Sequence, residues 1–473
     1  MIRFPISSPG AGYNFDDPPA PAFKEVMVHD PSIFKSGDMY YVFGSHMAAA
    51  RSHDLISWEQ VSTHVSPHNP FMRDVDDFKD AFEWSQSRTF WAGDIQPMPD
   101  GRFLMYYCNC QGSMPLGDIG LAVSSNAEGP YINQGMFLKS GMRWISEDGT
   151  PYNPTIHPNC VDPHAFFDAD GIYRLLYGSF SGGIFIMTLD PSTGLPIPGQ
   201  GYGKKLMGGN HGRIEGPYML YSPQTKYYYL FVTFGGLRHD EGYNIRVARS
   251  HSVEGPFYDA AGQEMTDVKG AEGTIFDDRS IEPFGTKIMG GYWFMQEMGE
   301  PGRSTTGHIS PGHNSAYYDS ETGRYFLLFH QRFPHSRATH QVRVHEMFMG
   351  EDGWFVVSPF RYDGASLRSF KPQHVHGAWK IICHGQEINY TPNISVTVTL
   401  NPDGSVNVHR SGYETGEWTL GADGKAFTIT LDGTCYKGYL LRSYAADHDA
   451  WVMSFTALSA KGVALWGAGV CGL

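Results

Sequence analysis

One phrase recurs along this chain: an acidic residue, a proline at once or shortly after it, and then an apolar strand rich in aromatic residues. The phrase is found at residues 29–34, 161–167 and 214–220. A fourth relative, at residues 90–97, keeps the acidic residue and delays the proline. Such repetition predicts similar strands arranged about one axis. Carboxylates from distant parts of the chain would then converge on one pocket.

Five units with the same internal order emerge when these phrases are aligned. Each unit opens with a polar residue at the start of a short strand, followed by a turn, an aromatic strand and a third strand. The units begin near residues 28, 90, 162, 215 and 312. Three or four strands repeated five times predict an all-β fold, a five-bladed β-propeller. The 56 glycines, 30 prolines and 14% aromatic residues agree, because they favour many short strands joined by turns.

The spacing of the units is uneven, because long insertions separate the predicted strands. They lie at about residues 62–89, 132–160, 190–213 and 258–311. Long loops in a compact domain are usually functional, so we expect these segments to wall a groove at one end of the propeller. The acidic run Asp74–Asp80 lacks the glycine and closing glutamate of an EF-hand loop and is interpreted as a solvated loop.

The pattern changes near residue 366, where short alternating runs are joined by tight turns. The runs at 395–400 and 405–408, and those at 417–420 and 426–431, are typical of an antiparallel meander. We therefore assign residues 1–365 to the propeller and residues 366–473 to a smaller C-terminal β-barrel or sandwich. This second region has no cluster of carboxylates, which favours a structural or sugar-binding role.

Charge and cysteine content narrow the range of partners. The net charge of −14 argues against nucleic acid or an anionic membrane as the main partner, because both require a basic surface. No uncharged apolar run is long enough to span a bilayer. Six scattered cysteines without a CxxC pair are expected to be buried free thiols. The segment Met1–Pro5 does not read as a signal peptide, so we expect either a cytoplasmic protein or a secreted one without its leader.

Taken in order, these motifs resemble those of glycoside hydrolase family 43, and within it the endo-α-1,5-L-arabinanases. The resemblance covers the first three quarters of the chain, and the two-domain form matches a subset of these enzymes. It implies an inverting hydrolase that acts on arabinan or arabino-oligosaccharides. In that family pattern Asp30 matches the general base, Glu215 the general acid and Asp162 a third carboxylate. A polymeric substrate favours secretion, and we expect a monomer.

The resemblance also indicates residues that bind substrate or metal. Trp91 and Asp94 belong to the motif of the second blade, and Ser179 and Phe180 to a substrate-binding stretch. His313 matches the residue that faces a metal in the central channel of many members. We expect a single calcium ion, largely coordinated by water, because calcium prefers oxygen ligands. A core position and a direct contact with substrate remain open for His313.

The chemistry of these residue types fits the implied reaction. Inversion by single displacement needs one ionised and one protonated carboxyl group, separated by roughly 6.5–9.5 Å to admit a water molecule. Asp162 close to Glu215 would raise the pKa of the acid by like-charge repulsion. The flat faces of Trp91, Phe90 and Phe180 suit furanose rings, although packing inside a blade remains the alternative for the two phenylalanines.

Several alternatives stay open at this point. Ser179 either contacts a sugar hydroxyl or serves as a turn residue, and Arg332 is a further candidate to reach the pocket. An exo-acting α-L-arabinofuranosidase or β-xylosidase on the same scaffold is the nearest rival. A non-catalytic sugar-binding propeller is a rival of another class, which the intact acidic positions disfavour.

Overall fold

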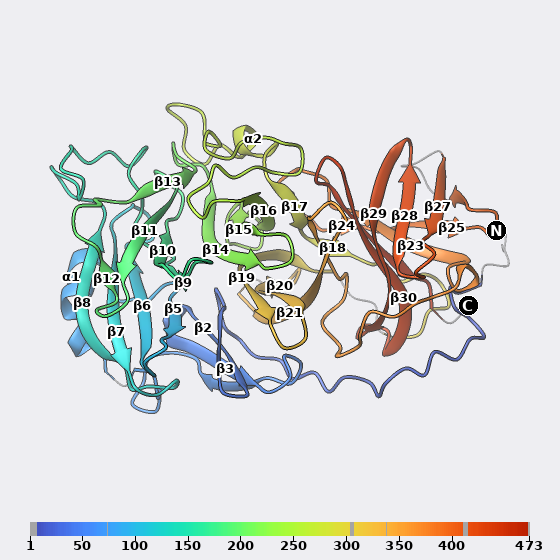
Figure 1. The fold of residues 1–473 in the computed structure, drawn as a ribbon, viewed down its shortest axis with the longest axis horizontal. Coiled ribbons are helices and arrows are strands. Elements are labelled where there is room, and N and C mark those ends of the chain that lie inside the picture. Colours follow the sequence, from blue (N-terminus) through green and yellow to red (C-terminus); the bar gives the residue numbers. More distant parts are fainter. Residues whose placement is uncertain (1–6, 73, 303–306, 337, 410–414, 472–473) are drawn as a thin grey trace.

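The computed structural model describes residues 7–72, 74–302, 307–336, 338–409 and 415–471. The segment Met1–Pro5, on which the expectation about a leader depends, lies outside these ranges. Five four- or five-stranded sheets form the larger body, and a closed barrel forms the smaller one (Figure 1). The predicted five-bladed β-propeller followed by a C-terminal β-barrel is therefore confirmed. No helix in the described ranges is long and apolar enough to cross a membrane.

Each blade is an antiparallel sheet whose strands follow one another in sequence. The first contains β1 (Ser32–Ser36), β2 (Met39–Gly44), β3 (Ala48–Ser52) and β4 (Glu59–Ser62). The second contains β5 (Asp94–Pro97), β6 (Phe103–Cys110), β7 (Gly117–Ser124) and β8 (Ile132–Lys139). The third contains β9 (His164–Phe167), β10 (Tyr173–Tyr177), β11 (Ile184–Asp190), β12 (Leu195–Pro196) and β13 (Lys204–Met207). The fourth contains β14 (Ile214–Ser222), β15 (Tyr227–Phe234), β16 (Asn244–Ser250) and β17 (Thr286–Met289). The fifth contains β19 (Ile309–Asp319), β20 (Arg324–Arg332), β21 (His340–Met349) and β22 (Phe355–Val357).

The aromatic strands are buried on both faces, which explains their composition. On β6, Leu104 and Tyr106 pack into one hydrophobic cluster, whereas Met105 and Tyr107 pack into another. Successive side chains of a strand point to opposite faces, so each aromatic strand contributes to the two cores that separate its blade from its neighbours. A run of large apolar residues without polar alternation is therefore what this position in a propeller requires.

Two matching turns clamp neighbouring blades together. The segments around Glu128 and Glu254 share the sequence Glu-Gly-Pro, and both contain a cis peptide bond before proline. Glu128 accepts a 2.7 Å hydrogen bond from Arg51 of the first blade. Glu254 accepts a 3.0 Å hydrogen bond from Arg174 of the third blade. Each glutamate thus links its own blade to the preceding one.

The C-terminal region closes into an eight-stranded barrel with its own hydrophobic core. Its strands are β23 (Gly377–Cys383), β25 (Val396–Leu400), β26 (Ser405–Val408), β27 (Gly416–Leu420), β28 (Ala426–Leu431), β29 (Thr434–Ala445), β30 (Ala450–Ser459) and β31 (Ala464–Gly469). The predicted runs at 396–431 coincide with β25 to β28. The first described residues lie against this barrel, and the chain then runs back to the first blade (Figure 1). Asp17 anchors that segment by pairing with Arg442 at 2.6 Å.

The remaining elements lie in the segments that connect these strands. They are α1 (Lys79–Ser85), α2 (Asp278–Ile281), short 3-10 turns at Ser45–Met47, Asp76–Phe78 and Pro372–His374, and the parallel pair β18 (Tyr292–Trp293) and β24 (Asn393–Ile394). The interpretation of Asp74–Asp80 as a loop was wrong in part, because its second half starts the helical segment that leads into α1. Phe78 and Ala81 are buried there and hold the segment against the second blade. The β18–β24 pair joins the propeller to the barrel.

Candidate active site

Three blade entrances share an unusual backbone conformation. Asp30 and Asp162 both have φ of +56°, and His313 has φ of +44°. This left-handed region is uncommon for residues other than glycine, and such residues cluster at functional sites. The equal values at Asp30 and Asp162 are the structural counterpart of the repeated sequence phrase. Each entrance turns its polar side chain away from the blade core.

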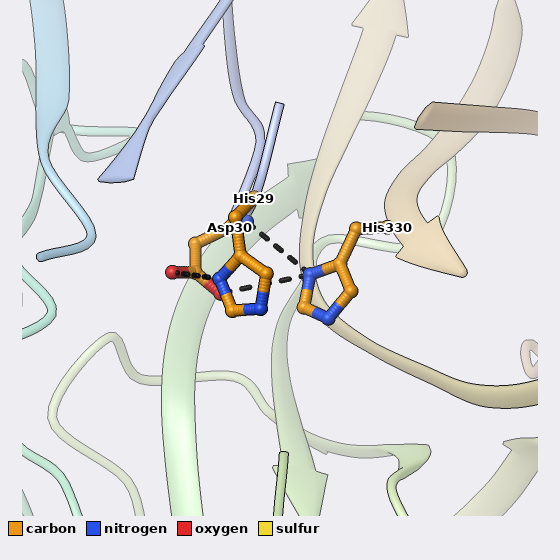
Figure 2. Close-up of side chains that lie close together, drawn as sticks. All are labelled: His29, Asp30 and His330. Atoms are coloured by element: carbon orange, nitrogen blue, oxygen red, sulfur yellow. Dashed lines mark hydrogen bonds and ion pairs between the residues drawn. The ribbon is translucent and has the colours of Figure 1, made fainter. Parts of the chain in front are cut away.

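Asp30 lies at the centre of a buried network, with only 4% of its surface exposed. Its Oδ2 accepts hydrogen bonds from His29 Nδ1 at 2.6 Å and from the Ser45 hydroxyl at 2.5 Å. Its Oδ1 lies 3.2 Å from Nδ1 of His313 and 3.6 Å from Nδ1 of His330. Figure 2 shows the His29 ring next to the Asp30 carboxylate and the His330 ring beyond it; the two imidazole rings stack, with centroids 4.0 Å apart. His29, Ser45 and His313 thus face the carboxylate and hold it in place.

These contacts keep Asp30 ionised. Burial alone would raise the pKa of its carboxyl group, but the ring nitrogens of His29 and His313 that face the carboxylate outweigh burial and hold the pKa well below its usual range. The imidazole of His330 accepts a 3.2 Å hydrogen bond from the Asp30 backbone amide. Burial lowers the pKa of His330 well below its usual value, so this ring is neutral. Asp30 is therefore ionised, and its carboxylate can accept a proton from a donor placed directly beside it.

Glu215 has the opposite tendency. It follows the start of β14 and is also buried, and burial is the largest influence that raises the pKa of its carboxyl group to about 7. Two hydroxyl groups oppose this shift by favouring the ionised form: Ser179, at 2.7 Å from Oε2, and Tyr243, which donates to Oε1. The negative charge of Asp30 raises the pKa further. Glu215 therefore carries a proton over much of the range below neutral pH.

Asp162 is tied to the same site through the backbone. Its Oδ2 accepts a 3.2 Å hydrogen bond from the amide of Gly216, the residue that follows Glu215. Burial and the charge of Glu215 raise the pKa of the Asp162 carboxyl well above its usual range. Two buried carboxyl groups this closely coupled do not both ionise readily, so one of the two stays protonated. The sequence predicted that the charge of Asp162 would raise the pKa of Glu215. Burial is the largest influence on that pKa, and Asp30 is the carboxylate whose charge raises it further.

The other predicted residues fall into two groups. Asp94 and Phe90 are built into the scaffold: the two Asp94 carboxylate oxygens accept hydrogen bonds from Ser32 at 2.5 Å and from the Ala165 amide at 2.7 Å. Phe90 is buried in the core between the first two blades. The geometry therefore gives Asp94 the role of joining three blades, and gives Phe90 the packing role that the sequence left open. Neither offers a free group to a sugar.

Trp91 and Phe180 are half-buried, whereas Ser179 is buried beside Glu215. Trp91 is half-buried, and its indole N–H donates to the Cys110 carbonyl at 3.1 Å, which fixes the plane of the ring. Phe180 is half-buried and makes an edge-to-face contact with Phe276, with a distance of 5.5 Å between the ring centroids. Ser179 contacts Glu215 directly, so its hydroxyl orients the carboxyl group.

Arg332 acts on the site through His29. One of its terminal nitrogens lies 2.9 Å from Nε2 of His29, whose other nitrogen contacts Asp30. Because Arg332 is always a donor, Nε2 of His29 is the acceptor, and Nδ1 carries the proton donated to Asp30. Arg332 also donates to the Leu237 carbonyl at 3.0 Å. The sequence made Arg332 a candidate to reach the pocket, and in the structure its guanidinium group is linked to Asp30 through His29.

Sequence reasoning missed five residues of this site. His29 and His330 were adjacent to the motifs and are the easiest to recognise in retrospect, because an imidazole beside a carboxylate is a common orienting pair. Ser45 and Tyr243 are supplied by segments with no motif of their own. Phe276 lies in the insertion before α2, and its side chain is 52% exposed beside Phe180. Only the fold shows that these segments meet.

The residues around His313 fit a hydrated cation. With Nδ1 facing Asp30, the Nε2 lone pair of His313 is the nitrogen that can face an ion or its water. Asn314, the next residue, buries both polar atoms of its side chain without a hydrogen-bond partner in the described ranges. His29, Asp30 and His330 lie close enough to share an ion. Their hydrogen bonds to one another and to Arg332 already occupy most of these donor atoms, which favours contact through water.

A five-bladed β-propeller that gathers two aspartates and a glutamate from three blades, with one carboxyl group ionised and another protonated, defines a glycoside hydrolase of the two-carboxylate type. The profile of glycosyl hydrolases family 43 matches residues 22–281, and that of a C-terminal lipocalin-like domain matches residues 359–467. The protein belongs to glycosyl hydrolases family 43.

Similarity to individual proteins extends over nearly the whole chain. The extracellular endo-α-(1→5)-L-arabinanase 2 of Bacillus subtilis (strain 168) is 52% identical over 448 residues, which are 94% of each chain. The extracellular endo-α-(1→5)-L-arabinanase of Thermotoga petrophila is 45% identical, again over 94% of each. Among solved structures, a family 43 glycoside hydrolase from Bacillus licheniformis superposes with a TM-score of 0.91 at 49% identity, covering 95% of this chain and 100% of that one. The endo-1,5-α-L-arabinanase from Thermotoga petrophila gives 0.89 at 44% identity, covering 95% and 99%.

Proposed function

We propose that this protein hydrolyses internal α-1,5-L-arabinofuranosidic bonds of arabinan with inversion at the anomeric carbon. The observation that carries the proposal is the opposite shift of two carboxyl groups in one network: the pKa of Asp30 is lowered, and that of Glu215 is raised to about 7. Relatives that are 52% and 45% identical over nearly the full chain are named endo-arabinanases, which favours endo over exo action. Retention of all three carboxylates disfavours a non-catalytic sugar-binding propeller.

Asp30 acts as the general base. Its carboxylate accepts a proton from the water that attacks the anomeric carbon, while His29 and Ser45 fix its orientation. The same donors stabilise the ionised form, so the base is ready at every pH above the lowered pKa of Asp30. Arg332 holds His29 in the tautomer that donates to Asp30. The base is thus oriented by a chain of two residues.

Glu215 acts as the general acid. Below a pH of about 7 its carboxyl group carries the proton that the leaving oxygen needs. Asp162, held 3.2 Å from the Gly216 amide, keeps the backbone beside the acid in place and discourages ionisation of Glu215. Proton donation to the sugar oxygen and proton removal from water then take place on opposite faces of one bond.

Aromatic side chains supply the contacts to the sugar rings. Phe276 is held in the left-handed region, with φ of +58°, and its neighbour Asp278 pairs with Arg213, two residues before the acid. Such strain in an exposed aromatic residue indicates a functional placement. Phe276 and Phe180 together present apolar ring surface beside Glu215, and Trp91 is a further contact from the second blade.

We also propose a calcium ion near His313, contacted largely through water. When bound, the ion supplies positive charge that favours the ionised form of nearby carboxylates. His313 holds its Nδ1 toward Asp30, and the unpartnered polar atoms of Asn314 mark room for ordered water. A single chain contains the whole network of the three carboxylates, which is the basis for expecting a monomer.

The proposed function is tested by the products formed from linear arabinan, debranched arabinan and xylan. Internal cleavage of arabinan releases a mixture of oligosaccharides at early times, and the first product formed has the inverted anomeric configuration by NMR. Release of arabinose alone from the start would support an exo-acting enzyme. Cleavage of xylan but not arabinan would overturn the assigned substrate.

A further inference from the structure

A cavity of about 150 Å³ lies between the propeller and the barrel. None of the residues that line it belongs to the network around Asp30 and Glu215. Its walls come from the N-terminal segment at Glu25, from β18 and the residues around it, from β21 and the chain after β22, and from the barrel turn at 444–448. Neither domain could form this cavity without the other.

Stacked aromatic rings line the cavity. Tyr292 stacks on His308, with ring centroids 4.8 Å apart and an interplanar angle of 28°. Phe294 stacks on Phe360 at 5.6 Å and 20°. Tyr444 contributes a further ring from the barrel. Flat aromatic surface of this kind suits the apolar C–H groups of a sugar ring, which is the main source of affinity in many sugar-binding sites.

The charged groups in the cavity balance one another. Glu25 accepts hydrogen bonds from Arg343 at 2.6 Å and from Arg361 at 2.5 Å, and it lies between the two guanidinium groups. Asp447 lies 3.8 Å from Nε2 of His308. Two positive and two negative side chains therefore cancel formally, while their remaining donors and acceptors stay available. A neutral ligand with many hydroxyl groups suits such a lining better than an ion.

One buried polar atom in this wall lacks a partner. Nδ1 of His308 is inaccessible to solvent and has no hydrogen-bond partner in the described ranges. Unsatisfied buried polar atoms are uncommon and call for an explanation such as water or a ligand group. Since Nδ1 has no accessible surface, a ligand in the cavity reaches it only if the ring turns, so the contribution of His308 as it stands is its stacked ring.

The barrel turn that closes the cavity is rigidly held. Nζ of Lys380 lies 2.8 Å and 2.9 Å from the two carboxylate oxygens of Glu300 and 3.2 Å from Nε2 of His448. His448 in turn contacts the Pro301 carbonyl at 2.9 Å. Glu300, His448 and Cys471 lie close enough to hold a metal, but the ammonium group of Lys380 already occupies their common centre. The network preorganises the cavity, which reduces the entropic cost of binding.

We propose that this cavity binds one neutral sugar residue, and that the barrel serves to complete this second carbohydrate site. The volume admits a single ring and not an oligosaccharide, so the ligand is a monosaccharide unit or the end of a chain. The identity of that unit as arabinofuranose rests on the proposed function. A site of this kind would hold the substrate polymer near the propeller while the active site around Asp30 and Glu215 cleaves it.

The test counts the ligands bound by a variant that cannot cleave them. Glu215→Gln serves as the background, and α-1,5-arabinotriose is titrated into it by calorimetry. Ala446→Trp places a large side chain in the cavity from the exposed barrel turn, whereas Ala460→Trp places the same side chain on the barrel surface outside it. We expect two sites per chain in Glu215→Gln and in its combination with Ala460→Trp, and one site in its combination with Ala446→Trp.

Equal numbers of bound ligands in the two tryptophan variants would overturn the inference, as would a single site in Glu215→Gln alone. Phe360→Ala provides a second variant in case Ala446→Trp melts at a lower temperature. Loss of that ring should weaken the second site about tenfold, the amount expected for one aromatic contact. Arabinan cleavage by the unmodified enzyme tests the proposed function separately. Cleavage together with a single binding site would leave that function intact and reject the second site alone.

Discussion

The amide of Gly216 donates a 3.2 Å hydrogen bond to Oδ2 of Asp162, so the residue that follows Glu215, the proposed proton donor, is fixed by the second aspartate. This bond connects the entrance of the third blade to the entrance of the fourth. It gives Asp162 two separable roles, since its oxygen accepts a backbone hydrogen bond while its charge influences Glu215. Substitutions that preserve one role and remove the other distinguish them.

Asp162→Asn should keep the fold and lose activity, whereas Asp162→Ala should lose both activity and stability. The asparagine oxygen can still accept from Gly216, but alanine leaves that buried amide unsatisfied, at a cost of about 1–3 kcal/mol. Chemical denaturation measures the stability, and initial rates on arabinan measure the activity. Equal stability of the two variants would show that the backbone hydrogen bond contributes little.

Tyr243→Phe should shift the alkaline limit of activity to higher pH. The Tyr243 hydroxyl donates to Glu215 and favours its ionised form, so its removal raises the pKa of Glu215 above the value of about 7. Glu215 must be protonated to act, and activity is lost as the pH rises through that pKa. The pH profile of kcat/KM reports the shift. If the alkaline limb of this profile moved to lower pH instead, the assignment of Glu215 as the acid would be contradicted.

Arg332→Ala should lower kcat by roughly tenfold with little change in KM, a size typical of losing part of general-base catalysis. Arg332 lies 2.9 Å from His29 and orients it toward Asp30, so its loss disturbs the base and not substrate binding. Steady-state kinetics on arabinotriose separate the two constants. A raised KM with unchanged kcat would instead support the expectation from sequence that Arg332 contacts the sugar.

Removal of divalent cations should lower the melting temperature and the activity together. His313, whose Nδ1 lies 3.2 Å from Oδ1 of Asp30, marks the proposed ion site. Exhaustive chelation followed by readdition of calcium or magnesium identifies the ion, and His313→Ala should abolish the response. An unchanged melting temperature and activity after chelation, with no ion detected by elemental analysis, would reject the proposed ion.

The sequence predicted the parts of this molecule that repeat. The phrases at Asp30, Asp162 and Glu215 were visible because each has a left-handed residue directly before its proline. That residue is the aspartate itself in the first two phrases and Gly216, with φ of +59°, in the third. The short strands and tight turns of the barrel were equally visible. In both regions the local pattern of residues determines the local structure, so reasoning from neighbouring residues was sufficient.

The partners of the site were not predictable in the same way. Tyr243 reaches Glu215 from the start of β16, and Ser45 reaches Asp30 from the turn after β2, and neither segment resembles a motif. Asp94 had the motif of a site residue, but the closure of the propeller makes it a link between blades. These roles depend on contacts between residues far apart in sequence, which pattern alone does not reveal.

The central claim, that Glu215 donates the proton and Asp30 removes one from water, is tested most directly by varying the leaving group. Glu215→Gln and Asp30→Asn are compared on arabinotriose and on a 4-nitrophenyl arabinobioside, whose leaving group needs no protonation. Glu215→Gln should lose roughly 10²–10⁴-fold on arabinotriose and far less on the nitrophenyl substrate, whereas Asp30→Asn should lose heavily on both. Equal losses by Glu215→Gln on the two substrates, or full activity of Asp30→Asn on either, would contradict the account.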